Sequence, residues 1–146
     1  GLYIVPILFI LIPLIYQVNS FEYNEIDKET LSIFNYVNNV MLITYTSNTD
    51  ISTRSLIAYA TLYHNITTPD GWGEFSVSKE LFKKVENAKF IENKSCEEIH
   101  KAFEELEIEQ VVGISDACNI LSDCKYSPIK IKDNVCLFES KRLINL

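Results

Sequence analysis

The sequence predicts a small single-domain α+β protein with about three to four helices, short antiparallel strands and a disulfide-linked C-terminal third. Three observations carry this prediction. Apolar residues recur at helical spacing behind capping residues, two alternating apolar runs follow Pro128, and all four cysteines lie in residues 96–146. A mainly α fold is the alternative, because the region 40–67 is compatible with strands or with a helix.

The first twenty residues predict a secretory signal. Leu2–Tyr16 carries no charge and is an apolar run, interrupted only by Pro6 and Pro13. This run is shorter than the roughly 20 residues that a membrane span needs, and it fits the apolar region of a signal peptide. Small residues end it at Val18-Asn19-Ser20. We expect residues 1–20 to be removed and residues 21–146 to form one globular domain, with no stable membrane insertion after cleavage. An uncleaved anchor is the alternative.

The leader has no basic residues and no initiator methionine. The signal peptide can therefore begin upstream of Gly1.

The cysteines predict two disulfides, because an even number in a secreted chain is typical of a covalent framework. Their spacing lacks Cys-x-x-Cys, which disfavours zinc and redox chemistry, and we predict no metal and no cofactor. Antiparallel packing of the helices that begin at Cys96 and Ser115 would place the start of the first beside the end of the second. The expected pairs, among three connectivities, are Cys96–Cys124 and Cys118–Cys136.

Two asparagines are candidate glycan acceptors. Asn65-Ile66-Thr67 and Asn93-Lys94-Ser95 both satisfy the N-glycosylation triplet. Behind a secretory signal, each triplet predicts an exposed surface segment.

The first half of the domain begins with a predicted helix over Lys28–Asn39, capped by Asp27. Residues 40–46 are rich in β-formers and predict a strand. Residues 55–67 alternate, with Ile57, Tyr59 and Tyr63 on one face, and we expect them to form a β-hairpin with the preceding strand. A helix with Leu56, Tyr59, Ala60 and Tyr63 on one side is the alternative. Residues 68–73 form a loop and residues 74–77 a short strand.

The second half is dominated by helices and ends in a hairpin. Ser78 caps a helix over Lys79–Asn87, and residues 88–92 form a connector or strand. Ser95 and Glu98 form a capping box ahead of a helix with a buried stripe. Residues 108–114 predict a strand or turn, and Ser115 caps a short helix that ends near Cys124. Residues 129–132 and 135–138 alternate around Asp133-Asn134, which predicts a hairpin.

The formal net charge of −7 disfavours binding to nucleic acid or to anionic membranes, which need clustered lysine and arginine. Residues 92–124 hold nine acids against Lys94 and Lys101, whereas residues 125–146 hold five bases against Asp133 and Glu139. Two interpretations follow. The two regions attract each other within one fold, or the acids of residues 97–109 form a docking face for a basic partner.

Trp72 and three glutamates are the candidate binding residues. Trp72 is the only tryptophan and stands between glycines in a predicted loop, where an aromatic side chain can anchor a partner or cover the core. The glutamates, on the predicted acidic helix, are Glu97, Glu104 and Glu105.

No catalytic constellation is evident, and we assign no catalytic residue. His64 and His100 are the only histidines. Ser115 stands in Gly-Ile-Ser-Asp, which lacks the second glycine of a Gly-x-Ser-x-Gly elbow.

These observations predict a secreted, non-enzymatic binding or effector protein that acts on an unknown extracellular protein partner. The alternative is a carrier of a small apolar ligand in a cavity lined by aromatic side chains, namely Phe34, Tyr36, Tyr45, Tyr59 and Tyr63. A third hypothesis is a secreted hydrolase built around His64 or His100, which would need a carboxylate or hydroxyl beside the imidazole.

Overall fold

A computed structural model describes residues 28–49, 53–70 and 77–142 of the chain. The predicted leader (1–20), Trp72 and most of the strand predicted at 74–77 lie outside these residues. The elements are α2 (Lys28–Ser32), the 3-10 helix η1 (Ile33–Tyr36), β1 (Met41–Thr44), α3 (Thr53–His64), α4 (Lys79–Lys89), α5 (Cys96–Glu105), β2 (Gln110–Ile114), α6 (Asp116–Asp123), β3 (Tyr126–Lys132) and β4 (Val135–Arg142). The α+β prediction is confirmed.

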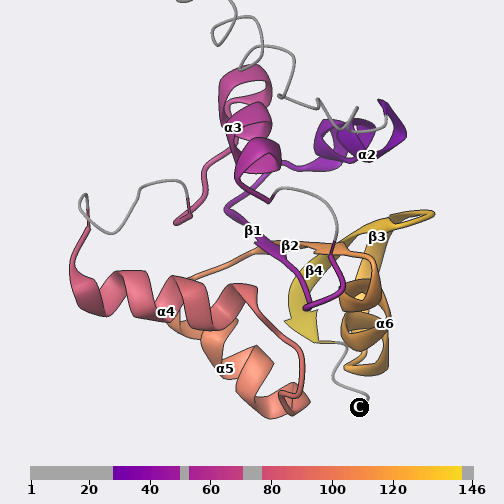
Figure 1. Ribbon diagram of the computed structural model, residues 1–146. Coiled ribbons are helices and arrows are strands. Elements are labelled where there is room, and N and C mark those ends of the chain that lie inside the picture. The colour runs from indigo at the N-terminus through magenta and orange to yellow at the C-terminus, as the bar shows by residue number, and fades with distance from the viewer. Residues whose placement is uncertain (1–27, 50–52, 71–76, 143–146) are drawn as a thin grey trace, which may run out of the picture.

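The four strands form one sheet in the order β1-β2-β4-β3, with helices on both of its faces (Figure 1). On one face, α4, α5 and α6 bury a cluster that includes Leu42, Val111 and Phe138. On the other face, η1 and α3 bury a cluster that includes Met41, Val112 and Leu137. Because successive strand side chains point to opposite faces, β1, β2 and β4 each supply both clusters, and β2 is buried along its whole length.

The first predicted helix is shorter than expected. It ends at Ser32, tightens into η1 and becomes extended at Val37, whose φ and ψ are −83° and 123°. The side-chain oxygen of Gln110 accepts hydrogen bonds from the backbone N–H groups of Asn38 and Asn39 at 2.8 and 3.1 Å. These bonds hold the chain out of the helix, so the predicted end at Asn39 is wrong.

The predicted hairpin over 40–67 is also wrong, because Thr53–His64 is the helix α3. Leu56, Ile57 and Ala60 are buried against the sheet, and their spacing of one, three and four residues gives one helical face. The Thr61 hydroxyl donates to the Ile57 carbonyl at 2.9 Å. Burial of this face outweighs the strand preference of the β-branched and aromatic residues in the segment.

Strand pairing is partly antiparallel, as expected, and partly parallel. The β2–β4 and β3–β4 pairs are antiparallel, and β3–β4 confirms the predicted hairpin. Strand β1 runs parallel to β2, with Met41 opposite Gln110. A parallel partner needs a long crossover, and here the connection contains α3, α4 and α5. The prediction of antiparallel strands alone is therefore wrong for β1.

The helix signals of the second half are confirmed. The Ser78 hydroxyl caps α4 by accepting from Leu81 N–H at 3.2 Å. Ser95 and Glu98 form the complete capping box of α5. Helix α6 follows Ser115 as expected, but the Ser115 side chain makes no capping hydrogen bond.

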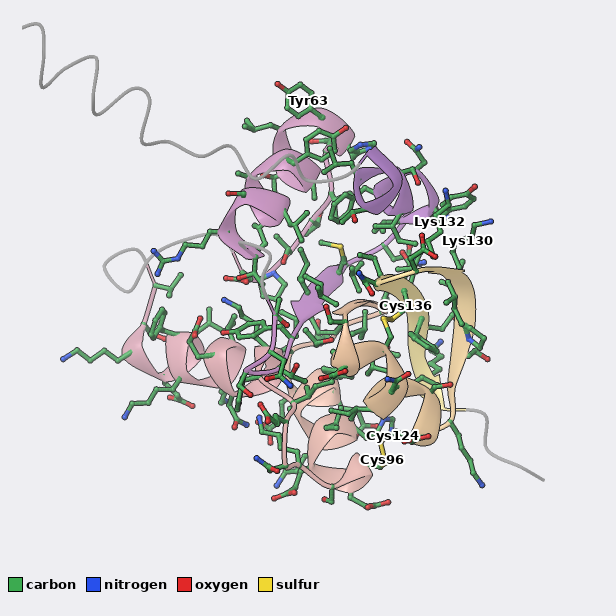
Figure 2. The ribbon with its side chains drawn as sticks, turned by 45° about the vertical axis from the view of Figure 1, so that its right-hand side comes forward. Tyr63, Cys96, Cys124, Lys130, Lys132 and Cys136 are labelled. Carbon is green, nitrogen blue, oxygen red and sulfur yellow. A yellow bond between two sulfur atoms is a disulfide. The ribbon has the colours of Figure 1, made fainter. Side chains whose placement is uncertain are left out.

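Both predicted disulfides are present. Cys96, the first residue of α5, is bonded to Cys124, which directly follows α6, and their Cα atoms are 5.2 Å apart. Cys118, within α6, is bonded to Cys136 of β4, with Cα atoms 5.8 Å apart. Helix α6 is thus linked to α5 at one end and to the sheet near the other (Figure 2).

Gly113 allows α6 to lie close to the sheet. A Cβ atom at this position would be 2.8 Å from Cys136 Sγ, 3.0 Å from Leu121 Cδ1 and 3.2 Å from the backbone nitrogen of Cys118. The backbone nitrogen and the cross-linked sulfur have little freedom to move. Only glycine therefore fits between α6 and the disulfide.

We expect Gly113→Ala to destabilise the protein by about 1–3 kcal/mol, the usual range for overpacking a core. Urea unfolding of the oxidised protein measures the change. Ser122→Ala, on the exposed side of α6, is the control and should stay within about 0.5 kcal/mol of the parent. Equal stability of Gly113→Ala and the parent protein would contradict the close packing of α6.

Candidate functional site

Helix α5 presents the strongest charge cluster among the described residues. Glu97, Glu104 and Glu105 are exposed, and the last two share one side of the helix with Glu97 because they follow it by seven and eight residues. We call these three residues the α5 acidic face. Glu107 and Glu109, in the turn after the helix, are also exposed and continue the negative charge toward β2.

The α5 acidic face stands on a rigidly held helix. Ile99 and Phe103 are fully buried beneath it. At its start, Glu98 accepts a hydrogen bond from the Ser95 backbone N–H at 2.8 Å, which lowers the pKa of that carboxyl below its ordinary value. The Cys96–Cys124 disulfide fixes the same end. The carboxylates therefore stand on a pre-ordered surface, and contacts to such a surface lose less entropy than contacts to a mobile one.

Two glutamates of the α5 acidic face have a nitrogen partner on the same helix. Lys101 Nζ lies 3.9 Å from Glu105 Oε1, and His100 Nε2 lies 3.4 Å from Glu104 Oε1. Exposed pairs of this kind contribute about 0–1 kcal/mol and exchange readily for another partner. The face therefore remains available to an external cation.

The lysines of the C-terminal hairpin lie far from α5. Lys130 and Lys132 lie in the second half of β3, beyond Cys136 and away from Cys96, where α5 begins (Figure 2). The Lys130 ammonium lies over the Tyr36 ring, 5.2 Å from its centroid. Lys125 differs from these two lysines, because it directly follows Cys124, which is bonded to the first residue of α5.

A buried lysine fixes the segment that leads to Trp72. Lys89 of α4 is almost fully buried, and its ammonium lies 2.9 Å from Asp70 Oδ2 and 2.9 Å from Glu86 Oε1. Burial lowers the pKa of Lys89, but the hydrogen bonds to Asp70 and Glu86 outweigh burial and raise the pKa above 10.5. The pair holds the chain in place two residues before Trp72.

The two histidines lie in different parts of the fold. His64, at the end of α3, packs against Tyr59 and Phe34 with ring centroids 5.4 and 6.1 Å apart. It also lines an open cleft of about 320 Å³ together with Glu109 and Asn65. His100 has the carboxylate of Glu104 beside it, but its side chain is only 29% exposed and its Nδ1 is buried.

Ser115 occupies a strained turn between β2 and α6. Its φ of 54° and ψ of −122° are uncommon for a residue with a side chain. His64 shares its cleft with Glu109, before β2, whereas Ser115 follows β2. The five residues of β2 span about 17 Å. A Ser115–His64 hydrogen bond is therefore out of reach.

His100 also lies in a different part of the fold from Ser115. Its ring lies 6.3 Å from that of Tyr126, which begins β3. Ser115 N–H donates to Asn134 O in the hairpin turn, beyond the other end of β3. The seven residues of β3 span about 20 Å.

The five aromatic residues predicted to line a cavity do not converge on one. Phe34, Tyr59 and Tyr63 form one packed series beside α3, and Tyr36 lies against Lys130. Tyr45 instead packs on Phe90, with ring centroids 5.9 Å apart. That pair lines an open cleft of about 360 Å³ at the carboxyl end of β1, together with Thr46 and Arg54.

Comparisons with known proteins give no relative: no family model, no curated protein and no solved structure matches this chain. Among residues 28–49, 53–70 and 77–142, no group of three or more histidine, cysteine or acidic side chains is arranged to hold a metal ion. None of the helices in these ranges has the length and apolar composition that a membrane span requires.

We expect Lys89→Met to destabilise the protein by about 3 kcal/mol at neutral pH, because Asp70 would stay poorly hydrated without a cation. Urea unfolding is the measurement. Lys84→Met is the matched control. Lys84 pairs with Glu80 on the exposed side of the same helix, and its loss should leave the urea midpoint close to that of the parent.

The Lys89–Asp70 ion pair also predicts that the stability of the protein depends on pH. Because the pKa of Lys89 is raised on folding, its stabilisation is complete below pH 10.5 and is lost as the pH rises through the folded-state pKa. The stability difference between the parent protein and Lys89→Met should narrow above pH 10.5. A difference that stays constant up to about pH 12 would contradict the assignment.

Proposed function

We propose that this chain is a secreted, N-glycosylated and non-enzymatic binding protein, which docks on a basic surface of an extracellular protein through the α5 acidic face. One observation carries the proposal. Exposed carboxylates lie on a helix that a capping box and a disulfide hold rigid, and Lys130 and Lys132 lie away from the start of that helix. Charge of one sign on a rigid helix favours a partner of the opposite sign.

Secretion is supported by the cross-links. Disulfides persist in oxidising compartments and are rare in the cytosol, and the described chain contains two. Both candidate glycan acceptors, Asn65 and Asn93, are exposed. The apolar leader predicted from the sequence would deliver the chain to the compartment where both modifications occur.

A binding role is favoured over catalysis by the separation of the reactive groups. The strained Ser115 and the two histidines are divided by the lengths of β2 and β3. His100 has the carboxylate of Glu104 beside it, but the strained Ser115 belongs to a different turn. A nucleophile and its base need direct contact.

A second candidate is a carrier of a small ligand in the cleft beside β1. The Thr46 hydroxyl is buried there, and no described residue is its hydrogen-bond partner. Tyr45 and Phe90 provide aromatic surface, and Arg54 a positive charge. A ligand with one apolar part and one polar or anionic group would complete these contacts.

The docking surface is tested with two variants of equal net charge. One carries Glu97→Gln, Glu104→Gln and Glu105→Gln. The other carries Glu80→Gln, Asp133→Asn and Glu139→Gln, which are exposed and lie outside α5. Each changes the net charge from −7 by three units to −4. The probe is an immobilised peptide rich in lysine and arginine, and the measurement is its Kd.

We expect the first variant to bind the peptide at least about tenfold more weakly and with a flatter salt dependence, since tenfold corresponds to 1.4 kcal/mol. The second should bind within about twofold of the parent. Equal weakening in both would show that only net charge matters and would contradict a docking role for α5. If Trp72→Ala loses binding and the α5 variant does not, the contact lies at Trp72 instead.

Secretion is tested by producing the full chain in eukaryotic cells. We expect the protein in the medium, beginning at Phe21 and with both disulfides formed. Intact-mass measurement and peptide mapping under non-reducing conditions check each point. A cytosolic product that retains residues 1–20 and has free thiols would contradict the proposal.

A further inference from the structure

We propose that Asn65 carries an N-linked glycan whose first N-acetylglucosamine stacks on the ring of Tyr63. The inference rests on the proposed secretion but not on the α5 acidic face. It assigns a role to the most exposed aromatic side chain that the structure describes.

The Asn65 triplet displays its acceptor on a fixed turn. Asn65 directly follows α3, is exposed and has a φ of 52°. Ile66 is buried, and its N–H donates to Ala60 O at 3.4 Å. Thr67 O accepts from Met41 N–H at 2.9 Å, which attaches the turn to β1. The backbone is held on both sides of Asn65, while the Asn65 and Thr67 side chains face solvent.

Tyr63 provides an ordered but exposed ring. Its side chain is 75% exposed and lies at the outer end of α3 (Figure 2). Its ring stacks on Tyr59 with centroids 4.9 Å apart and planes 33° apart. Tyr59 in turn lies 6.1 Å from the buried ring of Phe34. The series fixes one side of Tyr63 and leaves the other side uncovered.

A sugar at Asn65 is within reach of this ring. Two peptide units separate the residues, so their Cα atoms are at most about 7.6 Å apart. The apolar C–H face of a pyranose packs on the electron-rich face of an aromatic ring, whose quadrupole attracts the positive hydrogens. An uncharged sugar also suits a helix end where Thr61, Leu62 and Tyr63 are all exposed without a charged side chain.

The modification is a group transfer from a lipid-linked oligosaccharide diphosphate. Asn65 Nδ2 forms a bond with C1 of the first sugar, and the bond between C1 and the diphosphate oxygen breaks. The lipid diphosphate leaves with the bonding electrons, and Nδ2 releases one proton. No oxidation or reduction takes place.

Asn93 is an internal control for this geometry. It is also exposed, with a φ of 62°. The residue two positions before it is Ile91, which is only 1% exposed and offers no ring. A glycan at Asn93 therefore lacks the aromatic surface that Tyr63 gives to Asn65.

The experiment uses the full chain secreted from eukaryotic cells and trimmed enzymatically to one N-acetylglucosamine per site. In each of three backgrounds, the Tm of the trimmed glycoprotein is compared with the Tm of its Asn65→Gln version. The backgrounds are the parent, Tyr63→Ala and Leu62→Ala. Leu62 is the matched control, because it is 79% exposed and adjacent to Tyr63. Peptide mass spectrometry measures the occupancy of Asn65 and Asn93.

We expect the single sugar at Asn65 to raise Tm by about 3 °C in the parent and in Leu62→Ala, and by less than about 1 °C in Tyr63→Ala. An equal gain in all three backgrounds would overturn the stacking. Modification at Asn93 alone would overturn the inference but leave secretion intact. No modification at either site would overturn the inference and the proposed N-glycosylation, whereas secretion is decided by recovery of the protein from the medium.

Discussion

The close contact between α6 and the sheet at Gly113 is the constraint on which the rest of the structure depends. Because Gly113 has no Cβ, α6 lies close enough for Cys118 to bond Cys136 of the adjacent strand. This fixes the position of Cys124, which directly follows α6, and Cys124 holds the first residue of α5. The orientation of the carboxylates on α5 therefore depends on a glycine in a different element.

The sequence predicts those parts of the fold that local interactions determine. The α5 capping box needs only Ser95 and Glu98, and the C-terminal hairpin needs alternation on both sides of a short turn. The prediction fails at α3 because its composition favours strands, and only packing against the sheet selects the helical face. The parallel partner of β1 lies about seventy residues away, and strand composition alone does not identify it.

In the candidate site too, the local sequence predicts some features, and contacts between distant segments decide others. Helical periodicity places Glu97, Glu104 and Glu105 on one side of α5 without reference to the rest of the molecule. The pairing of Lys89 with Asp70 is different, because these residues belong to separate segments and meet only in the folded chain. A lysine on a helix is ordinarily solvated, so nothing in the local sequence marks Lys89 as buried.

The two proposed surfaces are compatible because α3 and α5 lie on opposite sides of the sheet (Figure 1). A glycan at Asn65 extends from the end of α3 and leaves the α5 acidic face uncovered. A glycan at Asn93 is different, because it is attached only four residues before Glu97 and would shield the start of α5. If both sites are occupied, a basic partner has freer access to Glu104 and Glu105 than to Glu97. The last turn of α5 would then contribute most of the attraction.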